Sequence, residues 1–222
     1  MQLTSPLDRF VFPAHHAPAR GARRGGVVVI QEIFGVTDHI RAMCDRFAAA
    51  GYEALAPAMY ERAEPGFEIK GAVTPDAIQQ ALPLVQKTPW SQVAADMQAA
   101  IDALTGPVFV TGFCWGGAAA WLAAQHCAGV AAASGFYGRA INDLLQDAPK
   151  APVILHYGKN DAGIPLTAVD AVRAAHPTVP IYLYDAGHGF CREGGHDFNE
   201  AARDKAMSRT LDFFGAQAER FA

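Results

Sequence analysis

The chain has 222 residues, of which 51% are hydrophobic and 18% are charged. This composition is typical of a globular protein and excludes a disordered chain or a coiled coil. The 18 Lys and Arg residues stand against 22 Asp and Glu, so the net charge is −4, and no basic run offers a surface for nucleic acid or an anionic membrane. We therefore expect one domain, residues 1–222, with a small molecule as its partner.

The location of the protein is predicted from the length of its apolar runs and from the composition of its amino terminus. The longest apolar runs, such as 27–30 and 128–133, fall far short of the roughly 20 residues of a membrane span. The first residues lack the basic and apolar regions of a secretion signal, so we expect a cytoplasmic protein that contacts no membrane. Four scattered cysteines without a Cys-x-x-Cys pair are expected to be thiols: Cys44, Cys114, Cys127 and Cys191.

Strand-like and helix-like segments alternate along the chain. This pattern is typical of an α/β fold with a mostly parallel, twisted sheet and helices on both of its faces. Strands are expected at 9–13, 27–31, 52–56, 108–111, 130–136, 153–157 and 181–184. Helices are expected at 38–50, 75–86, 91–104, 116–127, 165–176 and 197–214, with Pro165 as an early helical residue. Residues 61–74 lack a clear period and are expected to form a loop.

The segment Gly112-Phe113-Cys114-Trp115-Gly116 follows an apolar strand and precedes an alanine-rich helix. Gly-x-Cys-x-Gly in this context is a variant of the nucleophile elbow of α/β-hydrolases, whose tight turn leaves no room for side chains beside the nucleophile. The helix amino terminus favours a thiolate at Cys114 and directs backbone amides toward a developing oxyanion. The alternative is a buried structural cysteine in an ordinary β-α turn.

Two later loops carry residues that complete a triad in the chain order of this class of hydrolase, which is nucleophile, acid, histidine. Asp161 follows the expected strand 153–157, and His188 follows the expected strand 181–184. The imidazole would take the thiol proton, and the carboxylate would orient the imidazole. Asp161 could instead form a turn or cap a helix, and His188 could be a turn residue between glycines. The order on three strand ends favours the triad.

With these residues in hand, the sequence resembles the dienelactone hydrolase (carboxymethylenebutenolidase) family of the α/β-hydrolase superfamily. The matching segments extend over nearly the whole chain and lie at 31–35, 56–60, 112–117, 161, 187–190 and 209–214. The resemblance implies the α/β-hydrolase fold and the roles of nucleophile, acid and base for Cys114, Asp161 and His188. It also implies that Glu32 takes the thiol proton in the resting enzyme and releases the thiolate when substrate binds. Otherwise Glu32 would be a solvated acid at a strand end.

The same resemblance implies the remaining residues of the site. The oxyanion donors fall on the backbone amides of Ile33 and Trp115. Arg192 corresponds to an arginine that holds the substrate carboxylate, and a guanidinium suits a bidentate grip of that group. Tyr137 corresponds to a tyrosine in the pocket wall, and Phe34 to a substrate-binding position. Without the resemblance, Arg192 would be read as a surface arginine on a polar loop.

One part of the family pattern is missing. Dienelactone hydrolases use a second carboxylate-binding arginine between the third strand and the next helix, where this chain reads Glu68-Ile69-Lys70-Gly71-Ala72-Val73-Thr74-Pro75-Asp76-Ala77. Arg62 or Lys70 are the stand-ins, but a lysine lacks the fork geometry of an arginine. Dienelactone and a different small ester or lactone are therefore equally plausible substrates.

The sequence predicts a hydrolase of a small ester or lactone, neutral or anionic, that uses a Cys-His-Asp triad and an acyl-enzyme. No cofactor or metal is expected, and the protein would be a monomer or a small homo-oligomer. Alternatives are a broad-specificity short-chain carboxylesterase of the same fold and a binding protein without turnover. A metal-assisted hydrolase built on His188, Cys191 and His196 has no recognisable zinc spacing, and a redox role for Cys114 lacks a nearby resolving cysteine.

Overall fold

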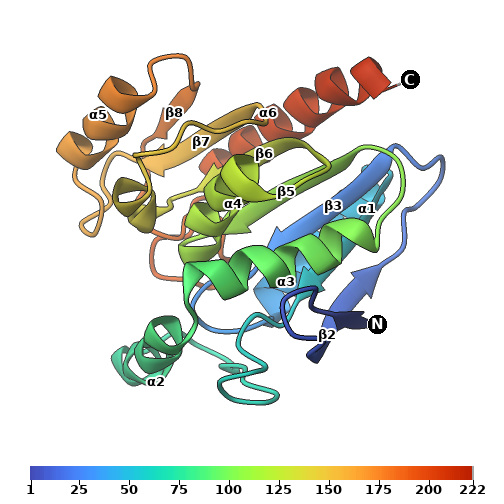
Figure 1. Ribbon diagram of the computed structural model, residues 1–222. Coiled ribbons are helices and arrows are strands. Elements are labelled where there is room, and N and C mark those ends of the chain that lie inside the picture. Colours follow the sequence, from blue (N-terminus) through green and yellow to red (C-terminus); the bar gives the residue numbers. More distant parts are fainter. Residues whose placement is uncertain (222) are drawn as a thin grey trace.

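A single sheet runs through the centre of the computed structural model, which describes residues 1–221 (Figure 1). The sheet has eight strands in the order β1-β2-β4-β3-β5-β6-β7-β8. β2 pairs antiparallel with both β1 and β4, and all other neighbours are parallel. The strands are β1 (Gln2–Thr4), β2 (Val11–Ala17), β3 (Gly25–Ile30), β4 (Tyr52–Pro57), β5 (Val108–Phe113), β6 (Val130–Phe136), β7 (Val153–Gly158) and β8 (Ile181–Tyr184).

Helices cover both faces of this sheet. In Figure 1, α3 and α4 lie in front of it, and α1 and α6 lie behind it, where Phe47 of α1 stacks on Phe214 of α6. The helices are α1 (Asp38–Ala49), α2 (Pro75–Lys87), α3 (Trp90–Asp102), α4 (Trp115–His126), α5 (Leu166–Ala175) and α6 (Glu200–Ala218), with 3-10 turns η1 (Arg139–Asp143) and η2 (Glu219–Phe221). The predicted α/β class and mostly parallel sheet are confirmed.

Three sequence predictions about the elements need correction. The short β1 was not predicted, because Gln2–Thr4 shows too little apolar alternation to be recognised without its partner strand β2. Pro165 was predicted inside the fifth helix, but its backbone is extended, with φ −62° and ψ 151°, so Pro165 caps the helix from outside. The strand at 9–13 begins two residues later than predicted and runs to Ala17.

The apolar run of β3 explains the position of this strand. Val27, Val28, Val29 and Ile30 are completely buried, because β3 lies between β4 and β5 and helices cover both of its faces. Continuous apolar sequence is what a strand covered on both faces requires. Burial of these four side chains fixes the end of β3, and the site is built directly after that end.

A buried polar network attaches α6 to the sheet. The imidazole of His156 on β7 bonds through Nδ1 to the Tyr184 hydroxyl at 2.8 Å and through Nε2 to the Thr210 hydroxyl at 3.1 Å. Thr210 also bonds to the Ser134 hydroxyl at 2.9 Å. Arg209 donates to the Tyr184 hydroxyl at 3.0 Å. These partners satisfy polar atoms that would otherwise be costly to bury in the core.

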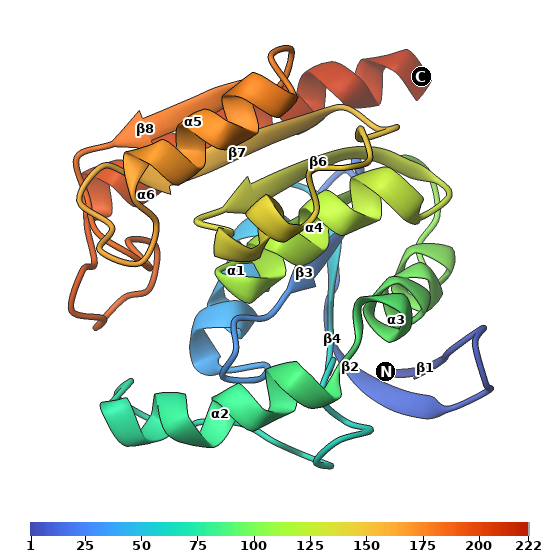
Figure 2. The ribbon, with the colours of Figure 1, turned by 60° about the vertical axis from the view of Figure 1, so that its left-hand side comes forward.

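Residues 61–74 form the predicted loop, and one part of it is anchored. Ile69 donates its amide to the Phe34 carbonyl at 2.9 Å, and Glu68 forms an ion pair with Arg41 of α1. Gly35 lies against this loop with φ +83°, and a Cβ there would be 2.3 Å from the Phe67 carbonyl oxygen. Helix α2 follows the loop and lies apart from the helices that flank the sheet (Figure 2).

The cysteines and helices also answer two questions raised by the sequence. All four cysteines are free thiols, as predicted. Among the helices of residues 1–221, none is both long enough and apolar enough to cross a lipid bilayer.

Candidate active site

The turn at Cys114 has the geometry of a nucleophile elbow. Cys114 joins β5 to α4 with φ 56° and ψ −117°, a left-handed backbone conformation that costs a non-glycine residue on the order of 1–3 kcal/mol. A Cβ at Gly112 would lie 2.0 Å from the Gly116 carbonyl oxygen, and one at Gly116 would lie 2.4 Å from the Gln31 carbonyl oxygen. Both glycines are therefore required by the close packing of α4 against β5 and β3.

Two backbone amides of this region are free to donate. Trp115 is the first residue of α4, so its N–H has no acceptor within the helix. Within residues 1–221, neither Trp115 nor Ile33 donates its amide to another loop or turn carbonyl, whereas the Cys114 amide itself donates to the Phe136 carbonyl at 3.0 Å. The two amides belong to the positions that the family resemblance implies as oxyanion donors.

Asp161 and His188 are in direct contact. The Nδ1 of His188 donates to Oδ2 of Asp161 at 2.6 Å. The other carboxylate oxygen of Asp161 accepts the amides of Gly163 and Ile164 at 2.8 and 3.1 Å. Asp161 thus orients His188 and also forms the local turn that its alternative reading proposed. Its side chain has no solvent exposure, so the ion pair is formed in a protected environment.

The protonation of His188 responds to this environment. Burial alone lowers the pKa of the imidazole, but the hydrogen bond to Asp161 and the nearby sulfur of Cys114 outweigh burial and raise the pKa of His188 to about 10. The raised pKa shows that the site stabilises an imidazolium. A histidine that accepts a proton from a thiol needs this property.

Tyr137 supports His188 and does not line the cavity. The tyrosine is completely buried, with φ 38°, and its ring packs edge-on against the His188 ring at a centroid distance of 5.1 Å. The pocket-wall position implied for Tyr137 by the family resemblance therefore differs from its place in the structure. The sequence could not show this difference, because the depth of Tyr137 depends on its packing against Phe190.

Glu32 and Arg192 bind each other. Arg192 donates through Nε to Oε2 of Glu32 at 2.9 Å, and its Nη2 also bonds to this oxygen. Nη2 also approaches the Thr37 hydroxyl at 3.4 Å, and the guanidinium lies over the Phe34 ring at 5.1 Å. The side chains are only 13% and 4% exposed, so neither the surface-arginine nor the solvated-acid reading fits. Within residues 1–221, Oε1 of Glu32 has no hydrogen-bond partner.

A cavity of about 390 Å³ brings most of these residues together. Six of the nine predicted site residues line it: Cys114, His188, Glu32, Ile33, Phe34 and Arg192. Asp161, Trp115 and Tyr137 stand behind the lining. The sequence analysis missed five further side chains that line the cavity, namely Ala72, Val73, Ile78, His196 and Asp197. The apolar positions of the expected helix 75–86 were visible in the sequence, but nothing there showed that this helix faces the site.

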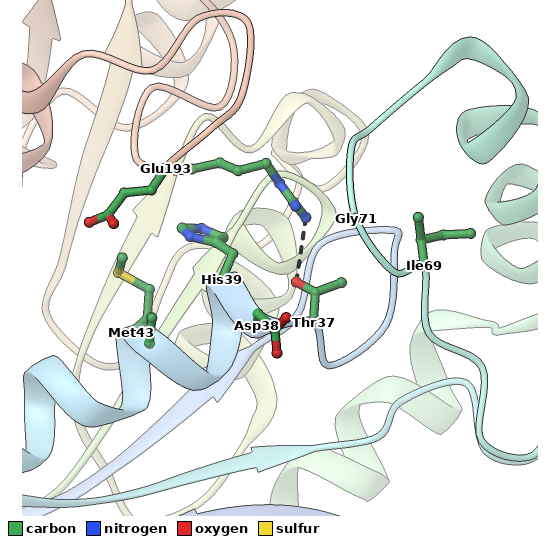
Figure 3. A pocket seen from close by; sticks show the side chains of 9 residues that line it. Thr37, Asp38, His39, Met43, Ile69, Gly71 and Glu193 are labelled. Carbon is green, nitrogen blue, oxygen red and sulfur yellow. Dashed lines mark hydrogen bonds between the residues drawn. The ribbon is translucent and has the colours of Figure 1, made fainter.

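A second cavity, of about 340 Å³, shares Arg192 with the first. Thr37, His39 and Glu193 are among its walls (Figure 3), but neither Cys114 nor His188 reaches it. Cys114 and His188 therefore line the first cavity and not the second.

The two proposed stand-ins for a second arginine lie elsewhere. Arg62 donates to Asp8 and Asp96, at 2.8 Å and 3.0 Å through Nη2, and stacks on the Phe10 ring. Lys70 is exposed. Neither residue lines the cavity with Cys114. The suggestion that Arg62 or Lys70 compensates is therefore wrong, because Arg62 is held in an ion-pair network beside the amino-terminal strands.

The metal-ligand set considered from the sequence does not come together. Cys191 is completely buried, whereas the side chain of His196 is 98% exposed. Across residues 1–221, no group of three or more His, Cys, Asp or Glu side chains is arranged to hold a metal ion.

Known proteins are similar to this chain in sequence and in fold. The family model described as the dienelactone hydrolase family matches residues 12–218. A protein of Methylorubrum extorquens, provisionally named a carboxymethylenebutenolidase, is 37% identical over 94% of this chain and 78% of its own length. An Escherichia coli protein with the same provisional name is 36% identical over 91% of this chain and 81% of its own length. The crystal structure of a provisionally named dienelactone hydrolase from Klebsiella pneumoniae superposes with a TM-score of 0.83 and 31% identity, covering 96% of this chain and 97% of the other. The chain therefore belongs to the dienelactone hydrolase family and is a hydrolase of that type.

Proposed function

We propose that the protein hydrolyses a small carboxylic ester or lactone through a Cys-His-Asp triad and an acyl-enzyme intermediate. The observation that carries this proposal is the 2.6 Å bond between His188 Nδ1 and Asp161, in a site where His188 lines one cavity together with Cys114 at a strained elbow. The contact between base and acid, and the cavity that base and nucleophile share, support a triad. The provisional names of the relatives from Methylorubrum extorquens and Escherichia coli support the same reaction class.

In the first step, His188 accepts the thiol proton and the Cys114 sulfur attacks the carbonyl carbon of the substrate. The carbon–oxygen π bond opens, and the negative charge develops on the carbonyl oxygen. The amides of Ile33 and Trp115 donate to this oxygen, and each donor of this kind lowers the barrier by about 3 kcal/mol. Asp161 holds the imidazolium in place until the intermediate collapses.

When the intermediate collapses, the bond to the alcohol oxygen breaks and His188 donates its proton to that oxygen. A thioester remains on Cys114. In the second step, His188 takes a proton from water, the resulting hydroxide attacks the thioester, and the sulfur leaves with the proton that His188 returns. The product acid departs, and the thiol is regenerated.

Glu32 and Arg192 complete the proposal. Arg192 holds Glu32 through one carboxylate oxygen and leaves Oε1 without a protein partner within residues 1–221. That oxygen is available to accept a hydrogen bond from the resting thiol, whose proton His188 takes when the sulfur attacks. A substrate carboxylate that binds Arg192 would compete with Glu32 for the guanidinium, so substrate binding and release of the thiol from Glu32 become linked.

Steady-state hydrolysis of dienelactone and of neutral p-nitrophenyl esters by the native protein, Cys114→Ser and Cys114→Ala tests this proposal. We expect turnover of at least one of these substrates, with loss of several orders of magnitude in kcat for Cys114→Ala at an almost unchanged Tm. Mass spectrometry of the native protein should show an acyl adduct on Cys114 during turnover. Undiminished turnover by Cys114→Ala would refute the assigned nucleophile.

A further inference from the structure

The segments that line the cavity differ in chemical character. The segment 188–197 contributes polar side chains, which include His188, Arg192 and Asp197. The stretch after β3 contributes Glu32, which Arg192 binds, together with the apolar Ile33 and Phe34. The chain beside and on α2 contributes only apolar side chains, namely Ala72, Val73 and Ile78. Figure 2 shows α2 at the lower edge of the molecule, apart from the main body of helices. We call Val73 and Ile78 the apolar wall.

The two side chains of the apolar wall are partly exposed and do not belong to the buried core. Val73 and Ile78 are each 36% exposed, while the other face of α2 buries Ala77, Ala81 and Leu84. Large apolar side chains at the edge of a cavity gain by contact with an apolar ligand, because that contact removes them from water. The wall therefore has the character of a binding surface for an apolar group.

The wall is also held in place. The Thr74 hydroxyl caps α2 by accepting the Ala77 amide at 3.2 Å, and Pro75 begins the helix. Upstream, the amide of Ile69 is bonded to Phe34, so the loop that leads to the wall is attached to the segment with the oxyanion amide of Ile33. A surface fixed at both ends can discriminate between substrates of different length.

The proposed reaction decides which part of the substrate meets this wall. His188 must reach the alcohol oxygen to donate its proton, so the leaving group lies on the side of segment 188–197. The acyl chain then extends away from His188, toward Phe34 and α2. Among the cavity residues of the described chain, Arg192 is the one Lys or Arg side chain, and Glu32 already binds it. The lining residues on and beside α2 therefore offer no positive charge to an acyl group.

We propose that Val73 and Ile78 bind the acyl chain of the substrate, and that the preferred substrates carry an uncharged, apolar acyl group longer than acetyl. This inference rests on the proposed function, because it needs His188 as the group that protonates the alcohol. In this arrangement the alcohol part of the substrate lies beside the polar segment 188–197, and the acyl part lies against the apolar wall. Each methylene that the wall removes from water is expected to raise kcat/KM by about fourfold, until the cavity is filled.

The test compares p-nitrophenyl acetate, butyrate and hexanoate, which share one leaving group. The native protein should show a kcat/KM for the butyrate or hexanoate at least about tenfold above that for the acetate. Ile78→Ser should reduce this ratio severalfold, mainly through KM, and Val73→Ser should do the same if Ile78→Ser fails to fold. Leu82→Ser is the matched control, because Leu82 is 41% exposed on the same helix but does not line the cavity. Leu82→Ser should keep the native ratio.

Three outcomes distinguish failure of this inference, of the substrate orientation and of the proposed function. A native preference for the acetate, or equal ratios for Ile78→Ser and Leu82→Ser, would overturn the inference while leaving the triad intact. A second series of acetate esters with longer alcohols tests the orientation, and an effect of Ile78→Ser confined to that series would place the leaving group on the wall instead. Hydrolysis of all these esters by Cys114→Ala would instead overturn the proposed function.

Discussion

Arg192 and Glu32 lie 160 residues apart in the sequence and are joined by two hydrogen bonds to a single carboxylate oxygen. The pair is formed at the edge of the cavity with little solvent exposure of either side chain. A buried pair of this kind costs desolvation energy when it forms, and removal of one partner leaves the other charge uncompensated. The pair is therefore a sensitive point for stability and, in the proposed function, for the recognition of anionic substrates.

Arg192→Ala should destabilise the protein by about 2–4 kcal/mol, because Glu32 would remain buried without its cation. Urea unfolding at neutral pH measures this change. The double variant Arg192→Ala with Glu32→Gln should recover much of the loss, since the uncompensated charge is gone. Additive losses in the double variant would contradict the coupling.

The same Arg192→Ala should raise KM for acidic esters more than for neutral ones, and equal effects on both would remove its assigned role.

Asp161→Asn should lower kcat/KM by roughly two to four orders of magnitude, because an amide cannot stabilise the imidazolium and favours the wrong tautomer. The fold should persist, since the Asn oxygen can still accept the amides of Gly163 and Ile164. Loss of the carboxylate should also move the pKa of His188 down from about 10. An NMR titration of the His188 ring protons measures this shift, and an unchanged titration would show that Asp161 does not set the pKa.

His156 predicts an acid limit to stability. Burial, together with the nearby Arg209, lowers the pKa of this histidine from 6.5 to about 3. The unfolded chain binds the proton below about pH 6.5 while the folded chain does not, so stability is complete above that pH and is lost as the pH falls toward 3. Between pH 6.5 and 5 this histidine should account for a loss of about 2 kcal/mol in the free energy of unfolding.

The control for this prediction is His156→Gln, which retains hydrogen-bonding groups for Tyr184 and Thr210 but does not titrate. Urea unfolding of both proteins at pH 7, 6 and 5 should show a shallower dependence on pH for the variant. Parallel curves for the two proteins would mean that other groups cause the acid sensitivity.

Gly116→Ala should damage both folding and activity. The added methyl would lie 2.4 Å from the Gln31 carbonyl oxygen, a contact that requires α4 and β3 to separate. We expect a loss of several kcal/mol in stability, together with a large fall in kcat. Gly215→Ala on α6 is the control, because its Cβ would meet only the flexible end of Arg24, at 2.8 Å. That variant should be neutral or more stable by up to about 1 kcal/mol. Similar losses for both would exclude the steric account.

Most of the fold could be predicted from the sequence, because most of the strands can be recognised from their apolar composition. Continuous apolar runs such as 27–30 require cover on both faces, and this requirement already implies a parallel α/β sheet. The three residues of β1 carry no such signal, since their pairing with Val11–Pro13 exists only in three dimensions. Pro165 was misplaced by one helical position because its fixed φ suits the extended cap as well as the first turn.

For the site, chain order and strand ends were sufficient to identify Cys114, Asp161 and His188 as candidates. Partners that depend on tertiary approach were not predictable. The sequence gives no indication that Arg192 binds Glu32, or that Arg62 is occupied by Asp8 and Asp96.

The contact of Gly116 with the end of β3 has a wider consequence. The carbonyls of Ile30 and Gln31 set the position of the helix that carries the Trp115 amide, and the same stretch of chain continues directly to the amide of Ile33. One steric contact thus determines the spacing between the two amides, and the side chain of residue 114 takes no part in it. If Cys114 and these two amides act as proposed, exchange of the attacking sulfur for an oxygen would leave the spacing of the oxyanion donors unchanged.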